Sequence, residues 1–78
     1  MIEIYTRDGC NQCILEKQFL LNNQIEYKET KIDIDISREE VVAKFPNQKS
    51  LPIITLRGDV IGSEEMRVLV EENQLQLL

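Results

Sequence analysis

Two cysteines separated by two residues, Cys10-Asn11-Gln12-Cys13, are the side chains of this sequence best suited to covalent chemistry. A thiolate attacks a disulfide sulfur, and a second thiol close by can displace the bond that forms, so such a pair can cycle between dithiol and disulfide. The chain contains no histidine, which excludes imidazole bases, Cys/His nucleophile pairs and histidine-containing zinc sites. The sequence therefore predicts dithiol–disulfide exchange at these two cysteines.

The residues around the cysteines predict a strand followed by a helix. Ile2, Ile4 and Thr6 recur at every second position, which is the period of a strand, and an Asp-Gly pair interrupts the pattern before Cys10. Residues 13–22 contain no glycine or proline, and we expect a helix there. The apolar residues whose spacing places them toward one side of this helix are Ile14, Leu15, Phe19 and Leu21.

Cys10 would then lie at the N-terminus of the helix, where we expect its thiol pKa to be lowered. Unpaired backbone N–H groups and the positive helix end stabilise a thiolate at that position. Arg7, three residues earlier, adds a positive charge beside the thiolate and could also hold a carboxylate of a substrate. Cys13 lies one turn further on the same side, so we expect it to resolve a mixed disulfide formed at Cys10.

The next segment predicts a second strand and a short second helix. Ser37-Arg38-Glu39-Glu40 fits a capping box, Val41 and Phe45 form an apolar pair four residues apart, and Pro46 stops the helix. A strand, a helix and a strand in about 35 residues suggest a right-handed parallel unit. The residues that alternate along the predicted second strand, with an interruption near residues 29–31, are Ile25, Tyr27, Ile32, Ile34 and Ile36.

The last third of the chain predicts a hairpin and a final helix. Ile53-Ile54-Thr55-Leu56 and Val60-Ile61 indicate two short strands, and Gly58-Asp59 between them can provide the positive-φ positions of a tight turn. Ser63 can cap a helix that carries two glutamates in its first turn. The predicted order of elements is βαβαββα. The apolar residues on one face of the final helix are Met66, Leu69 and Val70.

Size, charge and cysteine content restrict the class of protein. A chain of 78 residues buries only about 60% of its unfolded surface, so we expect one domain over residues 1–78. The formal net charge of -5, without a basic stripe, argues against nucleic acid as a partner. No apolar run approaches the roughly 20 residues that cross a bilayer, and no export signal is recognisable. We therefore expect a cytoplasmic protein without membrane contact. We also expect a monomer, although no sequence feature specifies the oligomeric state.

Two other interpretations of the cysteine pair remain open on spacing alone. The pair could be half of a four-thiolate zinc site completed by another chain, or two core residues at this spacing by chance. In a reducing cytosol a single pair is reactive or metal-bound more often than it is a structural staple. Its place at a strand-to-helix junction favours the redox interpretation, with no metal expected.

The sequence resembles the glutaredoxin family, a branch of the thioredoxin fold, over nearly the whole chain. The resemblance implies an α/β fold in which a four-stranded mixed sheet is flanked by three helices. It also implies a glutathione-dependent disulfide oxidoreductase that serves electron transport and cell redox homeostasis. The landmarks that carry the resemblance occur in order: Tyr5-Thr6-Arg7 before the cysteine motif, Ser50-Leu51-Pro52 where the family usually has Thr-Val-Pro, the hairpin, and Gly62-Ser63-Glu64-Glu65.

In that family glutathione lies across the active cysteine as the reducing co-substrate, and the resemblance implies matching contacts here. Arg7 matches the basic residue near the glycine carboxylate. The backbone of Leu51 would pair with the glutathione cysteine like an added strand, with Pro52 in cis holding the loop against the sulfur. Ser63 and Glu64, at a helix N-terminus, would bind the γ-glutamyl carboxylate through backbone N–H groups. The remaining implied contacts are Gln12 and Gly62.

The sequence departs from the family pattern between the cysteines and before the final helix. Asn11 and Gln12 replace the usual Pro and Tyr, and Ile61 replaces the first glycine of a Gly-Gly pair. A glutamine before the second cysteine, as at Gln12, resembles the motif of the glutaredoxin-like redoxins. Those proteins are reduced by thioredoxin reductase and donate electrons to ribonucleotide reductase, and this is one alternative function. Another is a binding module in which Cys10 and glutathione from two copies bridge an iron–sulfur cluster.

Overall fold

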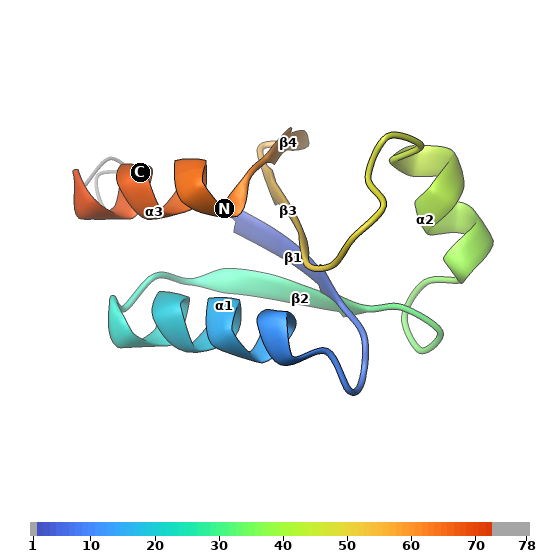
Figure 1. Ribbon diagram of the computed structural model, residues 1–78, viewed down its shortest axis with the longest axis horizontal. Helices are drawn as coiled ribbons and strands as arrows, with labels where there is room; N and C mark the ends of the chain where they lie inside the picture. Colours follow the sequence, from blue (N-terminus) through green and yellow to red (C-terminus); the bar gives the residue numbers. More distant parts are fainter. Residues whose placement is uncertain (1, 73–78) are drawn as a thin grey trace.

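The computed structural model describes residues 2–72 as a mixed sheet with helices on both of its faces (Figure 1). Among these residues no helix is both long and apolar enough to cross a bilayer. The elements, in chain order, are β1 (Ile2–Thr6), α1 (Asn11–Asn22), β2 (Tyr27–Lys31), α2 (Arg38–Lys44), β3 (Ile53–Leu56), β4 (Asp59–Ile61) and α3 (Ser63–Glu71). The predicted order βαβαββα is confirmed.

The sheet has the strand order β2-β1-β3-β4, so β1 is an internal strand. β1 runs parallel to β2, with α1 as the crossover between them, and antiparallel to β3, which in turn pairs antiparallel with β4. Apolar clusters cover both faces of this strand, which explains why Ile4 and Tyr5 are both buried although they point to opposite sides. The chain leaves β1 at Thr6 and reaches Cys10 immediately afterwards.

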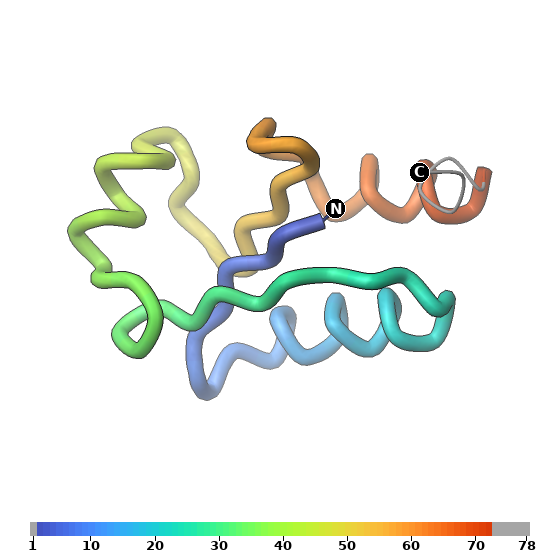
Figure 2. Tube along the Cα trace, turned by 180° about the vertical axis from the view of Figure 1, so that it is seen from behind, coloured from blue at the N-terminus to red at the C-terminus, as the bar shows by residue number. Residues whose placement is uncertain are grey.

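Two apolar clusters lie on the two faces of the sheet. The larger one joins β1 and β3 to α1 and α3 and includes Ile4, Leu20, Ile54 and Met66, all at most 1% exposed. The smaller one packs Val41 of α2 against the other face. Figure 2 shows from behind that α2 lies at the opposite end of the molecule from the end of α3. The open end of the sheet beside α2 is where the loop carrying Cys10 emerges.

The prediction for the second strand is wrong in its position. The expected interruption near residues 29–31 lies inside β2, and the isoleucines after it leave the sheet. Ile32 and Ile36 form an isolated parallel bridge around a turn in which Asp33 has φ 72°. The Asp35 carboxylate accepts a hydrogen bond of 2.9 Å from the backbone N–H of Lys31, and such a local bond competes with a strand ladder.

The expected inward side of the first helix is also wrong. Ile14, Leu15 and Leu21 are exposed by 47%, 53% and 62%, and only Phe19 of the predicted set packs against the core. The buried residues of α1 are Cys13, Glu16 and Leu20. The helix has almost no amphipathic pattern, because a carboxylate occupies a core-facing position and leucines face solvent.

Two turn and cap predictions need correction, and one cap prediction is confirmed. The positive-φ residues of the hairpin are Arg57 (φ 56°) and Gly58 (φ 88°), one position earlier than expected, as a two-residue loop of type I′ requires. The N-cap of α3 is Gly62, and Ser63 is the first helical residue.

Ser37 caps α2 by accepting a hydrogen bond of 3.2 Å from the N–H of Glu40, as expected. On the predicted inner face of α3, Met66 and Val70 are buried as expected, whereas Leu69 is half-buried.

Candidate active site

Cys10 is the N-cap residue of α1, and its sulfur faces the unpaired N–H groups of the first turn. The backbone N–H of Cys13 donates to Cys10 Sγ at 3.1 Å, and the Cys10 carbonyl accepts the first helical bond from Ile14 at 3.2 Å. The N–H of Cys10 donates to the Arg7 carbonyl at 3.3 Å, which closes the turn after β1. A sulfur anion at this position is stabilised by a hydrogen bond and by the positive helix end.

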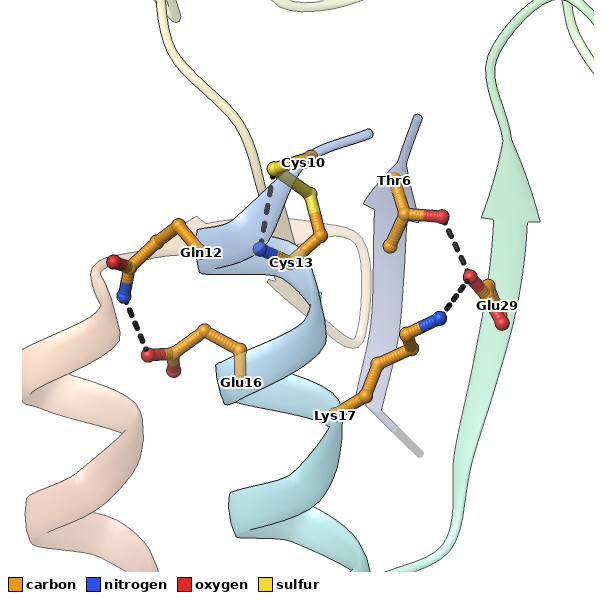
Figure 3. The surroundings of a disulfide bond; sticks show 7 residues. All are labelled: Thr6, Cys10, Gln12, Cys13, Glu16, Lys17 and Glu29. Atoms are coloured by element: carbon orange, nitrogen blue, oxygen red, sulfur yellow. Dashed lines mark hydrogen bonds and ion pairs between the residues drawn. A yellow bond between two sulfur atoms is a disulfide. The ribbon is translucent and has the colours of Figure 1, made fainter. Parts of the chain in front are cut away.

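The two cysteines form a disulfide with a Cα–Cα distance of 5.2 Å (Figure 3). Their environments differ. Cys10 is partly exposed, whereas Cys13 is 1% exposed and packed beneath it. An external sulfur can therefore reach Cys10 but not Cys13. This asymmetry suits Cys10 to attack on a substrate and Cys13 to displace the bond that results.

A groove of about 400 Å³ opens beside the Cys10 sulfur. Its floor comes from the turn after β2, from α2 and from β3, through Ile32, Val41 and Ile53, and the loop before β3 forms its far wall. The Leu51–Pro52 peptide bond in that loop is cis, as the resemblance implied. The residues that line the groove are Arg7, Cys10, Ile32, Arg38, Val41, Gln48, Lys49, Ser50, Leu51 and Ile53.

The groove is cationic although the chain carries a net charge of -5. Arg7, Arg38 and Lys49 line it, and its lining contains no carboxylate. Arg38 forms a solvent-exposed ion pair of 3.3 Å with Asp33, which is weak enough to exchange for another anion. Sequence reasoning identified Arg7 but missed Arg38 and Lys49. They lie on α2 and in the loop before β3, far from the cysteines along the chain.

The structure brings only part of the predicted site together at this groove. Arg7, Cys10 and Leu51 line it, whereas Gln12, Ser63 and Glu64 do not. Ser63 and Glu64 occupy the first turn of α3, where backbone N–H groups lack intrahelical acceptors. Gly62 precedes that turn as its N-cap, and its carbonyl accepts the first helical bond, from Met66 at 2.9 Å.

Polar networks flank the disulfide on its two sides, as Figure 3 shows. On one side Thr6 Oγ1 and Lys17 Nζ both donate to Glu29 Oε2, at 2.6 Å and 2.9 Å. The hydrogen bond from Thr6, followed by the donation and charge of Lys17 and the charge of Lys31, holds the pKa of the Glu29 carboxyl below its usual range, against the opposing effect of burial. On the other side Gln12 Nε2 donates to Glu16 Oε1 at 3.1 Å.

The part of the chain that the structure describes contains no cluster of three or more histidine, cysteine or carboxylate side chains arranged to hold a metal ion. The chemistry visible at the site is that of sulfur. Its components are a partly exposed cysteine at a helix N-terminus, a buried partner one turn on, and a cationic groove.

Comparison with known proteins agrees with this geometry. The family model described as glutaredoxin matches residues 2–61. A curated relative, an uncharacterized glutaredoxin-like 8.6 kDa protein in the rubredoxin operon of Clostridium pasteurianum, is 26% identical over 75 residues, which cover 92% of this chain and 100% of the relative.

Solved structures with the same fold include chains that match this one over most of their length. Glutaredoxin 1 from Francisella tularensis, crystallised with cacodylate, superposes with a TM-score of 0.74 at 26% identity and covers 94% of each chain. The thioredoxin-like protein BC3987 gives a TM-score of 0.72 at 26% identity, over 88% of this chain and 99% of that one. The chain belongs to the glutaredoxin family, with a redox-active cysteine pair on a thioredoxin-like fold.

Proposed function

We propose that this protein is a glutathione-dependent oxidoreductase that reduces protein disulfides and glutathione mixed disulfides. The observation that carries the proposal is the placement of Cys10. It caps α1 with a partly exposed sulfur, it opens onto a groove lined by cationic side chains and no carboxylate, and Cys13 lies buried beneath it. Family membership supports the same chemistry.

The reaction begins when the Cys10 thiolate attacks one sulfur of the substrate disulfide. A bond forms between Cys10 and that sulfur, and the other substrate sulfur leaves as a thiolate that takes a proton. Cys13, as its thiolate, then attacks Cys10 Sγ, which releases the second substrate thiol and leaves the Cys10–Cys13 disulfide. Two substrate sulfurs are reduced, and the two cysteines of the protein are oxidised.

Glutathione returns the protein to the dithiol. One glutathione thiolate attacks Cys10 Sγ to give a mixed disulfide and a free Cys13, and a second glutathione releases glutathione disulfide and the Cys10 thiol. Glutaredoxins have potentials of about -200 to -230 mV, close to that of the cellular glutathione pool, so either direction is accessible.

The groove offers groups that match the ends of glutathione. The glycine carboxylate would lie near Arg7, Arg38 and Lys49, and the backbone of Leu51 would pair with the central cysteine as an added strand does. The γ-glutamyl carboxylate would reach the N–H groups at the start of α3, beside Ser63 and Glu64. The tripeptide would thus span from the groove to α3 across the Cys10 sulfur.

A reductant assay tests the proposal. The protein at equal concentration is supplied either with glutathione, glutathione reductase and NADPH, or with thioredoxin reductase and NADPH, and NADPH consumption is followed with a glutathione mixed disulfide and with a protein disulfide. We expect turnover with glutathione, and we expect Cys10→Ser to abolish it. Turnover with thioredoxin reductase alone would instead support the redoxin function, and retained exchange in Cys10→Ser would refute the role of Cys10.

A further inference from the structure

Glu16 is a fully buried carboxylate on α1, one turn after Cys13, and the reaction described above does not use it. It is 0% exposed and occupies a position that faces the core between α1 and α3. Carboxylates are almost never fully buried unless they are paired. Its contacts should therefore show what it does.

Both contacts of Glu16 reach the same oxygen from different elements. Oε1 accepts a hydrogen bond of 3.1 Å from Gln12 Nε2, on the first turn of α1. It accepts another of 2.7 Å from Arg67 Nη2, on α3. The Arg67 guanidinium also lies 4.7 Å from the centroid of the Phe19 ring, which fixes its approach to α1. Figure 3 shows Gln12 and Glu16 directed together from α1 toward α3. Glu16 thus links the segment between the cysteines to α3.

Stability alone does not account for a carboxylate here. Oε2 of Glu16 is buried, and no hydrogen-bond donor within residues 2–72 reaches it. The side chain of Arg67 is 41% exposed, so water can solvate its charge when the carboxylate is absent, and a leucine could fill the buried position of Glu16 at little loss of stability. What a leucine could not do is hold the amide of Gln12.

The place where Gln12 is held bears on glutathione recognition. Arg67 lies one helical turn after Ser63, so the Glu16 contacts bring the side chain of Gln12 to the first two turns of α3. Gln12 keeps an amide oxygen and a second N–H that Glu16 does not use. These groups would border the space between the Cys10 sulfur and the N-terminus of α3.

We infer that Glu16 is a positioning residue that sets Gln12 against α3 for recognition of the γ-glutamyl end of glutathione. This inference rests on the proposed glutathione dependence. It assigns no step at the sulfurs to Glu16. It therefore separates binding of the γ-glutamyl group from thiol exchange, and fragments of glutathione can test that separation.

The test compares Glu16→Leu with the wild type, using glutathione, γ-glutamylcysteine and cysteinylglycine as reductants of the Cys10–Cys13 disulfide. Loss of one hydrogen-bonded contact predicts a rise in KM of about tenfold for the first two reductants. It predicts an unchanged kcat, and an unchanged KM for cysteinylglycine, which has no γ-glutamyl group. Glu16→Gln keeps an acceptor oxygen and should restore KM to within about twofold of the wild type. Glu71→Leu, at an exposed position of α3, is the matched control for losing a carboxylate.

A double-mutant cycle and a side-chain signal keep the test independent of stability. Once Gln12→Ala has raised KM, adding Glu16→Leu should change it no further, because both substitutions remove the same contact. The side-chain NH₂ of Gln12 should be ordered by NMR relaxation in the wild type and mobile in Glu16→Leu. An equal rise in KM for all three reductants, additive effects in the cycle, or an unchanged NH₂ signal would overturn the inference. A wild type that glutathione does not reduce would overturn the proposed function as well.

Discussion

Thr6→Val tests the polar network behind the active-site loop. Thr6 is the last residue of β1 and is 2% exposed, and its hydroxyl donates to Glu29 Oε2 at 2.6 Å. Valine keeps the shape of the side chain but removes the donor. Glu29 then keeps its ion pair with the Lys17 ammonium, at 2.9 Å, and the more distant charge of Lys31.

The expected loss of stability follows from the charge and exposure of Glu29. A hydrogen bond to a charged group contributes about 1.5–3 kcal/mol, and burying an added methyl group returns about 0.8 kcal/mol. The Glu29 side chain is 25% exposed, so water can replace part of the lost bond. We therefore expect the free energy of unfolding to fall by about 1 kcal/mol, which for a domain of this size lowers Tm by roughly 4–8 °C.

The loss of stability in Thr6→Val should depend on pH, and the direction follows from the Glu29 pKa. The hydrogen bond from Thr6 is the largest cause of the lowered Glu29 pKa in the folded protein, relative to a reference value of 4.5. A lowered pKa contributes stability above the unfolded value, and that contribution is lost as the pH falls through the folded pKa. The difference in Tm between wild type and Thr6→Val should therefore be largest at neutral pH and should shrink at a pH well below 4.5.

Thermal unfolding followed by circular dichroism, at neutral pH and at a pH well below 4.5, measures the difference in Tm. An NMR titration of the Glu29 carboxyl measures its pKa. In the variant the Glu29 pKa should move up toward its ordinary value. In a Glu29→Gln background Thr6→Val should lose its pH dependence, because the carboxylate is gone. A Tm difference that is the same at both pH values, or a Glu29 pKa that does not move, would refute this account of the network.

Three further substitutions test the site and the fold. Cys13→Ser should abolish reduction of protein disulfides but leave part of the removal of glutathione from mixed disulfides, which needs only Cys10; equal loss of both activities would contradict the resolving role. Arg7→Met should raise KM for glutathione roughly two- to fivefold, the range for an exposed ion pair, with the salt dependence of KM as a check. Gly58→Ala should cost about 1–2 kcal/mol in chemical unfolding, because φ is 88° there although a Cβ meets no neighbour; an unchanged midpoint would argue against the turn.

Most of the fold could be predicted from local sequence patterns. The order of elements, the cap at Ser37 and the inner face of α3 depend on spacing and on turn chemistry within a few residues. The predictions failed where two local signals competed. After β2 the isoleucine alternation suggested more strand, but the Asp35 side chain and the positive φ of Asp33 form a turn instead.

The inner face of α1 could not be predicted from apolar spacing. Ile14 and Leu15 are exposed, whereas Glu16 is buried, because the register of the helix is set by Cys10 as its N-cap and by the sheet beneath it. The charge of this buried carboxylate is balanced by Arg67, which reaches it from α3. That partner lies 51 residues away in the chain, so no local pattern indicates it.

Sequence alone determined the redox-active cysteine pair, because two cysteines one turn apart after a strand form a local arrangement that needs no distant residue to specify it. The tertiary structure decided what surrounds them. Arg38 and Lys49 join Arg7 around the groove, and Cys13 is buried while Cys10 is partly exposed, only because α2, β3 and the loop between them fold back against β1. The charge and burial of a site depend on which groups lie near it in space, and here those groups come from segments that meet only when the chain folds.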